Sequence, residues 1–132
     1  MNGVSLLFQR ECPCGSAAGY DACCGRLHRG QAAVSAVELM RSRYSAFVVG
    51  DTDYLFRTWH PRTRPADVAI DPQVRWTGLT ILGSGEDWVE FEAHHTHDGH
   101  ADVLHELSRF ERRGGRWTYV DGTLTPTTGD RS

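Results

Sequence analysis

Four cysteines lie within thirteen residues, in the run C-P-C-G-S-A-A-G-Y-D-A-C-C-G, and they limit what the start of this chain can fold into. A disulfide inside either cysteine pair would close a strained ring, because the two Cα atoms of a disulfide lie about 4.4–6.8 Å apart. Pairings between the two clusters are geometrically easy. The same spacing can also surround one tetrahedral zinc ion with thiolates. We expect a metal site, with zinc favoured over iron, formed by Cys12, Cys14, Cys23 and Cys24.

The beginning of the chain indicates where these thiols reside. Leu6, Leu7 and Phe8 make an apolar run of only three residues, without the charged and long apolar segments of an export signal. No stretch approaches the ~20 apolar residues of a membrane span. We therefore expect the reducing cytoplasm, where cysteines stay free to bind a metal.

Four thiolates around one divalent ion lower the formal charge of the chain from −3 to near −5. Arg10, Arg26 and Arg29 flank the cysteines and are expected to offset this charge. Four sulfur ligands leave no open coordination position, so the ion is expected to stabilise structure rather than polarise a substrate. A redox switch that releases the metal on oxidation is the alternative.

The sequence pattern of the rest of the chain predicts helices followed by strands. Apolar residues at spacings of three and four in 34–49 predict a helix with Ser35 as its N-cap and Gly50 as its stop. A second helix is expected from Asp51 until Pro61 ends it. Alternating patterns then predict antiparallel strands near 74–78, 88–96, 102–110 and 116–120. Helices that cover one face of a single curved sheet give an α+β fold.

Two sets of motifs resemble known proteins. C-x-C, eight residues and C-C resemble the SEC-C motif, the zinc knuckle at the C-terminus of the SecA translocation ATPase. Ala17 departs from that motif, where glycine is commoner, which matters if the position needs a positive φ. The later motifs resemble the YchJ-like family of uncharacterised bacterial proteins, and they lie at 38–47, 54–61, 76–79, 105–110 and 117–123.

The resemblance implies an N-terminal zinc knuckle followed by a cone-shaped domain like nuclear transport factor 2, abbreviated NTF2-like. We expect the knuckle at 1–30, the cone of helices packed on a curved antiparallel sheet at 31–125, and a loose tail at 126–132. Some family members carry a second, C-terminal knuckle, but this sequence has no cysteine after Asp121. Any role that needs two knuckles is therefore not expected here.

The concave side of such a cone is either an open pocket or a packed core. Strand alternation puts Glu106 and Ser108 on one face of the third strand, and Trp117, Tyr119 and Asp121 on one face of the last. If both faces meet the helices, a polar ligand or proton-transfer site results. Its candidate residues are Trp59, His60, Glu106, Ser108, Trp117, Tyr119 and Asp121.

The packed alternative uses the same residues differently. Trp117 and Tyr119 are then core residues, and Glu106 pairs with Arg41 or Arg43 across the helix–sheet interface. Histidines around the D-G turn raise a further hypothesis, a second metal site, although histidines at a turn are commonly solvated. That site would use His94, His95, His97, His100 and His105.

Two classes of function follow. The first is a zinc-binding accessory or protein-interaction module, whose knuckle exposes Tyr20 and Leu27 to a protein partner. The second is a small-molecule-binding protein or enzyme that uses the cone pocket. An excess of acidic over basic residues, 17 to 14, argues against nucleic-acid binding. An open sheet face would favour a homodimer.

Overall fold

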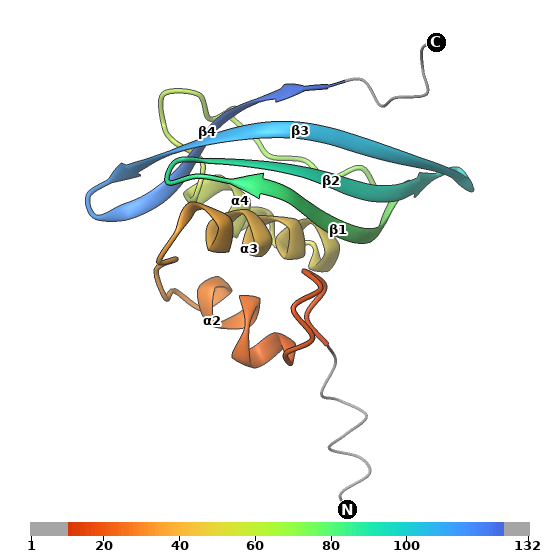
Figure 1. Ribbon diagram of the computed structural model, residues 1–132, viewed down its shortest axis with the longest axis horizontal. Coiled ribbons are helices and arrows are strands. Elements are labelled where there is room, and N and C mark those ends of the chain that lie inside the picture. The colour runs from red at the N-terminus through yellow and green to blue at the C-terminus, as the bar shows by residue number, and fades with distance from the viewer. Residues whose placement is uncertain (1–10, 126–132) are drawn as a thin grey trace, which may run out of the picture.

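The computed structural model describes residues 11–125, which form a small cysteine-rich unit, two helices and one sheet (Figure 1). The expectations for the apolar run at 6–8, for Arg10 and for a loose tail at 126–132 lie outside the described residues. Within the described part, no helix has the length and apolar character that crossing a membrane requires.

The cysteine-rich unit, called the knuckle below, contains a short turn of 3-10 helix, η1 (Tyr20–Ala22), and helix α2 (Cys24–His28). Helices α3 (Ala36–Val49) and α4 (Thr52–Arg57) lie against one face of the sheet (Figure 1). The antiparallel strands follow the order β1-β2-β3-β4, with bounds β1 (Val74–Ser84), β2 (Trp88–His97), β3 (His100–Arg113) and β4 (Arg116–Leu124). The predicted α+β class is confirmed.

Helix α3 begins and ends as predicted. The hydroxyl of Ser35 accepts a hydrogen bond from the backbone N–H of Glu38 at 3.1 Å, and Glu38 in turn accepts one from the N–H of Val34 at 2.8 Å. Gly50 ends the helix in the left-handed conformation, and its N–H donates to the carbonyl of Ala46 at 2.8 Å. These contacts satisfy backbone groups that a helix end leaves without partners.

Helix α4 ends earlier than predicted, at Arg57 rather than before Pro61. The reason is a parallel bridge to β4. The N–H of Tyr119 donates to the carbonyl of Thr58 at 2.8 Å, and the N–H of His60 donates to the carbonyl of Tyr119 at 2.7 Å. The chain therefore leaves the helix and becomes an extension of the sheet edge, a long-range pairing that local sequence patterns do not encode.

A β-bulge in β4 changes which side chains share a face. Phe110 pairs with Tyr119 and Arg109 pairs with Asp121, so Val120 is an extra residue on β4. An inserted residue reverses the alternation beyond it. Tyr119 therefore shares the helix-facing side with Phe110, whereas Asp121 lies on the other side and forms an ion pair with Arg109 at 2.7 Å. The expectation that Tyr119 and Asp121 share a face is wrong.

The core has two parts that meet below the sheet. The larger part packs helix residues such as Leu39 and Leu55 against strand residues such as Phe110, and the smaller consists of the buried knuckle cysteines. Leu79 of β1 contacts both parts. Leu27 of α2 is only 1% exposed and belongs to the larger core. The expectation that Leu27 is exposed is wrong, because α2 packs against α3.

Candidate metal centre and polar cluster

The four cysteine Sγ atoms come together in the knuckle, within 4.8 Å of one another. The Sγ atoms of Cys14 and Cys23 are 3.7 Å apart. A zinc–sulfur bond of ~2.3 Å implies a tetrahedron edge of ~3.8 Å, so this separation suits two ligands of one ion. All four cysteines are free thiols, and all except Cys23 are buried. This donor set fits a soft divalent metal such as zinc.

A compact loop positions the first two sulfurs. The N–H of Cys12 donates to the carbonyl of Ala18 at 2.8 Å, and the N–H of Gly15 donates to the carbonyl of Cys12 at 3.1 Å. The hydroxyl of Ser16 lies 3.2 Å from the Sγ atom of Cys23. The loop therefore lies against the start of α2, where the second pair of cysteines is located.

Ala17 lies in this loop with a φ of 71°. This left-handed backbone conformation favours glycine, and it costs other L-residues roughly 1–2 kcal/mol. The difference between Ala17 and the commoner glycine of the SEC-C motif therefore falls at a position that needs a positive φ.

Hydrogen bonds and burial shift the pKa values of the knuckle thiols in different directions. A hydrogen bond with Cys24 lowers the pKa of Cys14 to about 4, and contacts with Ser16 add to this effect against desolvation. The same contact raises the pKa of Cys24, and burial raises the pKa of Cys23. The lowered pKa of Cys14 favours its thiolate, the form in which cysteine binds metals.

Helix α3 holds the knuckle from the side of the cone. The guanidinium of Arg41 donates to the carbonyl of Cys14 at 2.8 Å, and the hydroxyl of Ser45 lies 3.6 Å from the Sγ atom of Cys12. Arg41 is therefore bonded to the loop and not to Glu106. No local sequence pattern indicates either contact, because both join residues far apart in the chain and depend on how α3 docks.

Arg26 and Arg29, expected to offset the charge of the cysteines, differ in their placement. Arg26 donates to the carbonyl of Cys23 at 2.9 Å and forms an ion pair with Glu38 at 2.7 Å, which links α2 to the start of α3. Arg29 instead pairs with Asp21 on the surface, at 3.4 Å.

Part of the candidate pocket forms a hydrogen-bonded cluster on the helix-facing side of the sheet. The carboxylate of Glu106 accepts bonds from the hydroxyls of Ser108, at 2.7 Å, and Tyr119, at 3.2 Å. This carboxylate lies against Gly122, in the space that a Cβ atom would fill. Gly122 is not among the predicted site residues, although glycine inside a strand often marks a close approach.

The side chain of Arg43 fills the space beside this cluster. Its guanidinium lies 5.0 Å from the ring centre of Trp59 and 4.5 Å from that of Tyr119, and it donates to the hydroxyl of Thr58 at 2.7 Å. Burial lowers the pKa of Arg43 to about 10, so it stays charged at neutral pH. Glu106 is linked to Arg43 through Tyr119 rather than by the direct ion pair considered above.

The remaining candidate residues lie apart from the Glu106 carboxylate. The ring of His60 lies 3.6 Å from Glu111. Trp117 is 7% exposed and packs in the larger core, and Asp121 is on the other side of the sheet with Arg109. The seven candidates therefore do not surround one common cavity.

The histidines of the β2–β3 hairpin do not assemble into a second metal site. Cross-strand pairing places His97 opposite His100, whereas His105 forms a hydrogen bond with Glu90 at 2.7 Å. Among residues 11–125, the knuckle cysteines are the one group of three or more metal-ligating side chains close enough to share an ion.

The sequence of the chain is similar to a family of known proteins. The sequence model for the YchJ middle NTF2-like domain matches residues 35–122. A UPF0225 protein of Streptomyces avermitilis is 56% identical over 120 residues, covering 85% of this chain and 83% of the relative. A UPF0225 protein of Cupriavidus metallidurans is 50% identical over 125 residues, covering 86% of this chain and 88% of the relative.

Two solved structures share the fold. The solution structure of a SEC-C motif containing protein from Rhodopseudomonas palustris has a TM-score of 0.76 and 33% identity, covering 89% of this chain and 100% of that one. The crystal structure of a SEC-C motif containing protein from Psychrobacter arcticus has a TM-score of 0.72 and 25% identity, covering 92% of this chain and 87% of that one. By its domain match and its relatives, the chain belongs to the YchJ-like, or UPF0225, family.

Proposed function

We propose that this protein binds one zinc ion in the knuckle and acts as a small accessory module for protein interaction. The observation that carries the proposal is the convergence of four sulfur atoms within 4.8 Å. Four sulfur ligands complete a tetrahedral site, so the ion would stabilise the loop and supply no open position for a substrate. Reduced thiols are needed for this, and we therefore also propose a cytoplasmic location.

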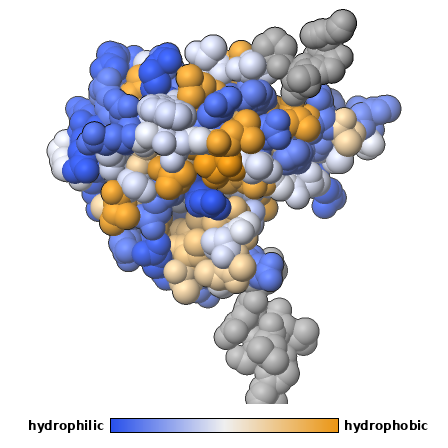
Figure 2. All heavy atoms as spheres, in the orientation of Figure 1, coloured by the Kyte–Doolittle hydropathy of each residue, from blue (hydrophilic) through white to orange (hydrophobic). Residues whose placement is uncertain are grey.

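The exposed side of the knuckle is the proposed docking surface. It carries the small apolar residues Ala17, Ala18 and Ala22, all exposed, and Figure 2 shows a pale orange area at the lower end of the molecule, where the knuckle lies. The contacts from Arg41 and Ser45 fix this surface against α3. Its small extent fits a weak, transient contact with a protein partner.

Metal content tests the first half of the proposal. Native mass spectrometry of protein purified without added metal should show one ion with the mass of zinc per chain, removed by a chelator. Cys23→Ser should lose the ion. The control variant His105→Ala, which removes a histidine from the β2–β3 hairpin, should retain it. Full metal content in Cys23→Ser, or two ions per chain in the wild type, would contradict the assignment.

Crosslinking in cells tests the second half. A photo-reactive amino acid at Ala18 should capture a discrete partner, and the product should disappear when Cys23→Ser is added. The same group at Thr77, an exposed position on β1, serves as the matched control. Equal capture from both positions, or capture that does not depend on Cys23, would contradict an interaction through the folded knuckle.

A further inference from the structure

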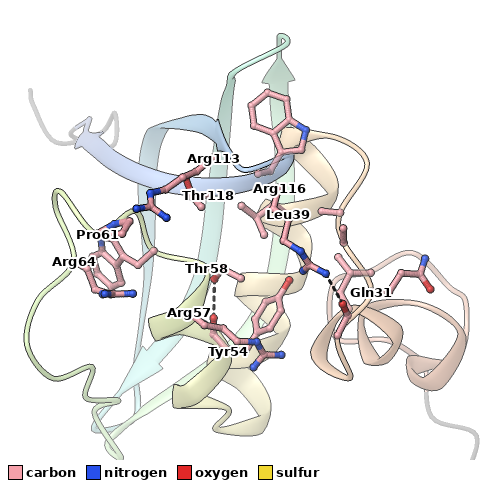
Figure 3. Close-up of a pocket in the computed structure, with 16 residues that line it drawn as sticks. Gln31, Leu39, Tyr54, Arg57, Thr58, Pro61, Arg64, Arg113, Arg116 and Thr118 are labelled. Carbon is pink, nitrogen blue, oxygen red and sulfur yellow. Dashed lines mark hydrogen bonds between the residues drawn. The ribbon is translucent and has the colours of Figure 1, made fainter.

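A cavity of about 280 Å³ lies away from the metal centre, between the segment that follows α2, the end of α4 and the β3–β4 hairpin (Figure 3). Arg57, Arg64, Arg113 and Arg116 line it, and no aspartate or glutamate does. In the view of Figure 3, Arg64 and Arg113 lie on one side of the cavity and Arg57 and Arg116 on the other. The formal charge of the chain is −3, so this concentration of positive charge is a local feature.

These arginines are not all neutralised by the protein. Arg57 forms an ion pair with Asp53 at 2.7 Å. Within residues 11–125, Arg64 and Arg116 bond only to backbone carbonyls, those of Phe56 and Gly30. Arg113 has no carboxylate within ion-pair distance in the same part of the chain. The cavity therefore has a surplus of cationic hydrogen-bond donors, the groups that recognise phosphates and carboxylates.

The β3–β4 hairpin supplies two of these arginines from directly paired positions. Arg113 of β3 and Arg116 of β4 are cross-strand partners on either side of the Gly114–Gly115 turn. Like charges at directly opposed positions destabilise an antiparallel pair. The side chains of Arg113 and Arg116 lie on opposite sides of the cavity (Figure 3), and an anion bound in the cavity would offset the positive charge that both bring to it.

The wall of the cavity also contains two tryptophans. Trp117 is 7% exposed, and its indole N–H has no hydrogen-bond acceptor in the described part of the chain; the same holds for the indole N–H of Trp59. Both tryptophans line the cavity. Because both indole nitrogens are buried, the two tryptophans offer the cavity ring surface, against which the apolar part of a ligand can pack.

We propose that this cavity binds a small organic anion. Its phosphate or carboxylate group binds among the lining arginines, to which the hairpin contributes Arg113 and Arg116, and its apolar part lies against Trp117 and Leu39. The volume is near the lower limit of small-molecule pockets, ~300 Å³, which indicates a ligand of metabolite size. Phosphate and carboxylate offer the same acceptor chemistry to arginine, so the test compares the two directly.

Nuclear magnetic resonance separates this cavity from the rest of the molecule. The chain has four tryptophans, and each gives one indole N–H signal. The signals of Trp59 and Trp117 report on the cavity, and those of Trp76 and Trp88, which do not line it, serve as internal references. The probes are inorganic phosphate, phenyl phosphate and benzoate, with phenol as the neutral control. At least one anion should give saturable shifts of the Trp59 and Trp117 signals, with little change at Trp76 and Trp88, and phenol should give none.

Matched variants decide whether the arginines hold the ligand. Arg113→Gln and Arg116→Gln change exposed hairpin residues, and each should raise the dissociation constant of the tightest probe at least tenfold. Arg75→Gln removes the same charge from an exposed position on β1 outside the cavity, and it should change the constant less than twofold. If one of the two hairpin variants fails to fold, the dissociation constant of the other still tests whether the arginines hold the anion.

The same experiment can overturn the proposal. It fails if none of the three anions shifts the Trp59 and Trp117 signals at millimolar concentration, or if Arg75→Gln weakens binding as much as the hairpin variants do. Stronger binding of phenyl phosphate than benzoate would identify a phosphate ligand, and the reverse a carboxylate. Zinc content is measured separately, so failure here leaves the metal proposal intact.

Discussion

At the scale of the single residue, Ala17 leads to the first prediction. Its φ of 71° is strained for alanine, and Ala17→Gly should remove that strain, less the entropy that glycine adds to the unfolded chain. We expect a stabilisation of about 0.5–1 kcal/mol, measured as tighter zinc retention against a competing chelator. Ala18→Gly, also exposed and not at a positive φ, should weaken retention slightly. Weaker retention in both variants would show that Ala17 is not strained.

Gly122 leads to the second residue-scale prediction. A Cβ atom there would overlap the carboxylate of Glu106, which is bonded to Ser108 and Tyr119. Gly122→Ala should therefore lower the free energy of unfolding by about 1–3 kcal/mol, through lost hydrogen bonds and overpacking. Urea unfolding measures this loss. In Gly83→Ala the added Cβ would meet only ordinary side-chain contacts, so that control should change stability by less.

A double-mutant cycle identifies the contact responsible. If the overlap with the Glu106 side chain causes the loss, Gly122→Ala should cost much less in a Glu106→Ala background. An equal loss in both backgrounds would assign the effect to the backbone of β4 instead.

At the scale of the element, the two parts of the core predict how the protein responds to metal removal. The knuckle cysteines form their own small cluster, whereas Leu27 anchors α2 in the larger core. A chelator should therefore increase amide hydrogen exchange strongly in residues 12–24, moderately in α2 and little in β2 and β3. Uniform acceleration along the chain would show that the ion stabilises the whole fold.

The same elements show what the sequence could predict. Ser35, Gly50 and the cysteine spacing act locally, through caps, turns and short loops, and their patterns predicted α3 and the convergence of the four cysteines. The end of α4 and the position of Asp121 depend instead on the bridge to Tyr119 and on the bulge at Val120. These are long-range features of sheet pairing, and periodicity along one segment carries no signal for them.

The arginine-lined cavity was missed for a related reason. Its charged residues come from α4, from the segment after it and from the β3–β4 hairpin, and none of these segments alone indicates a binding site. The sequence did contain one clue, the run R-R-G-G-R, because a two-glycine turn places Arg113 opposite Arg116. Only the docking of the knuckle and α4 beside this hairpin forms the cavity.

At the scale of the whole molecule, all four tyrosines report on packing. Burial is the main cause that raises the pKa of Tyr20, Tyr44, Tyr54 and Tyr119 above the ordinary value. The unfolded chain therefore releases phenolic protons near pH ~10, while the native state retains them. Stability from these groups is present in full below that pH and falls as the pH rises above it.

Absorbance at 295 nm and urea unfolding between pH 8 and 11 check this prediction. Tyrosine ionisation in native protein should lag behind that in urea, and the free energy of unfolding should decline above pH ~10. Burial lowers the pKa of Arg43 to about 10, which makes the free energy of unfolding rise with pH in this range. This effect opposes that of the tyrosines, but it comes from one group and theirs from four. Tyr119→Phe should make the alkaline decline shallower. An unchanged slope would mean that Tyr119 ionises freely, which its contacts with Glu106 and Arg43 in a packed cone would not allow.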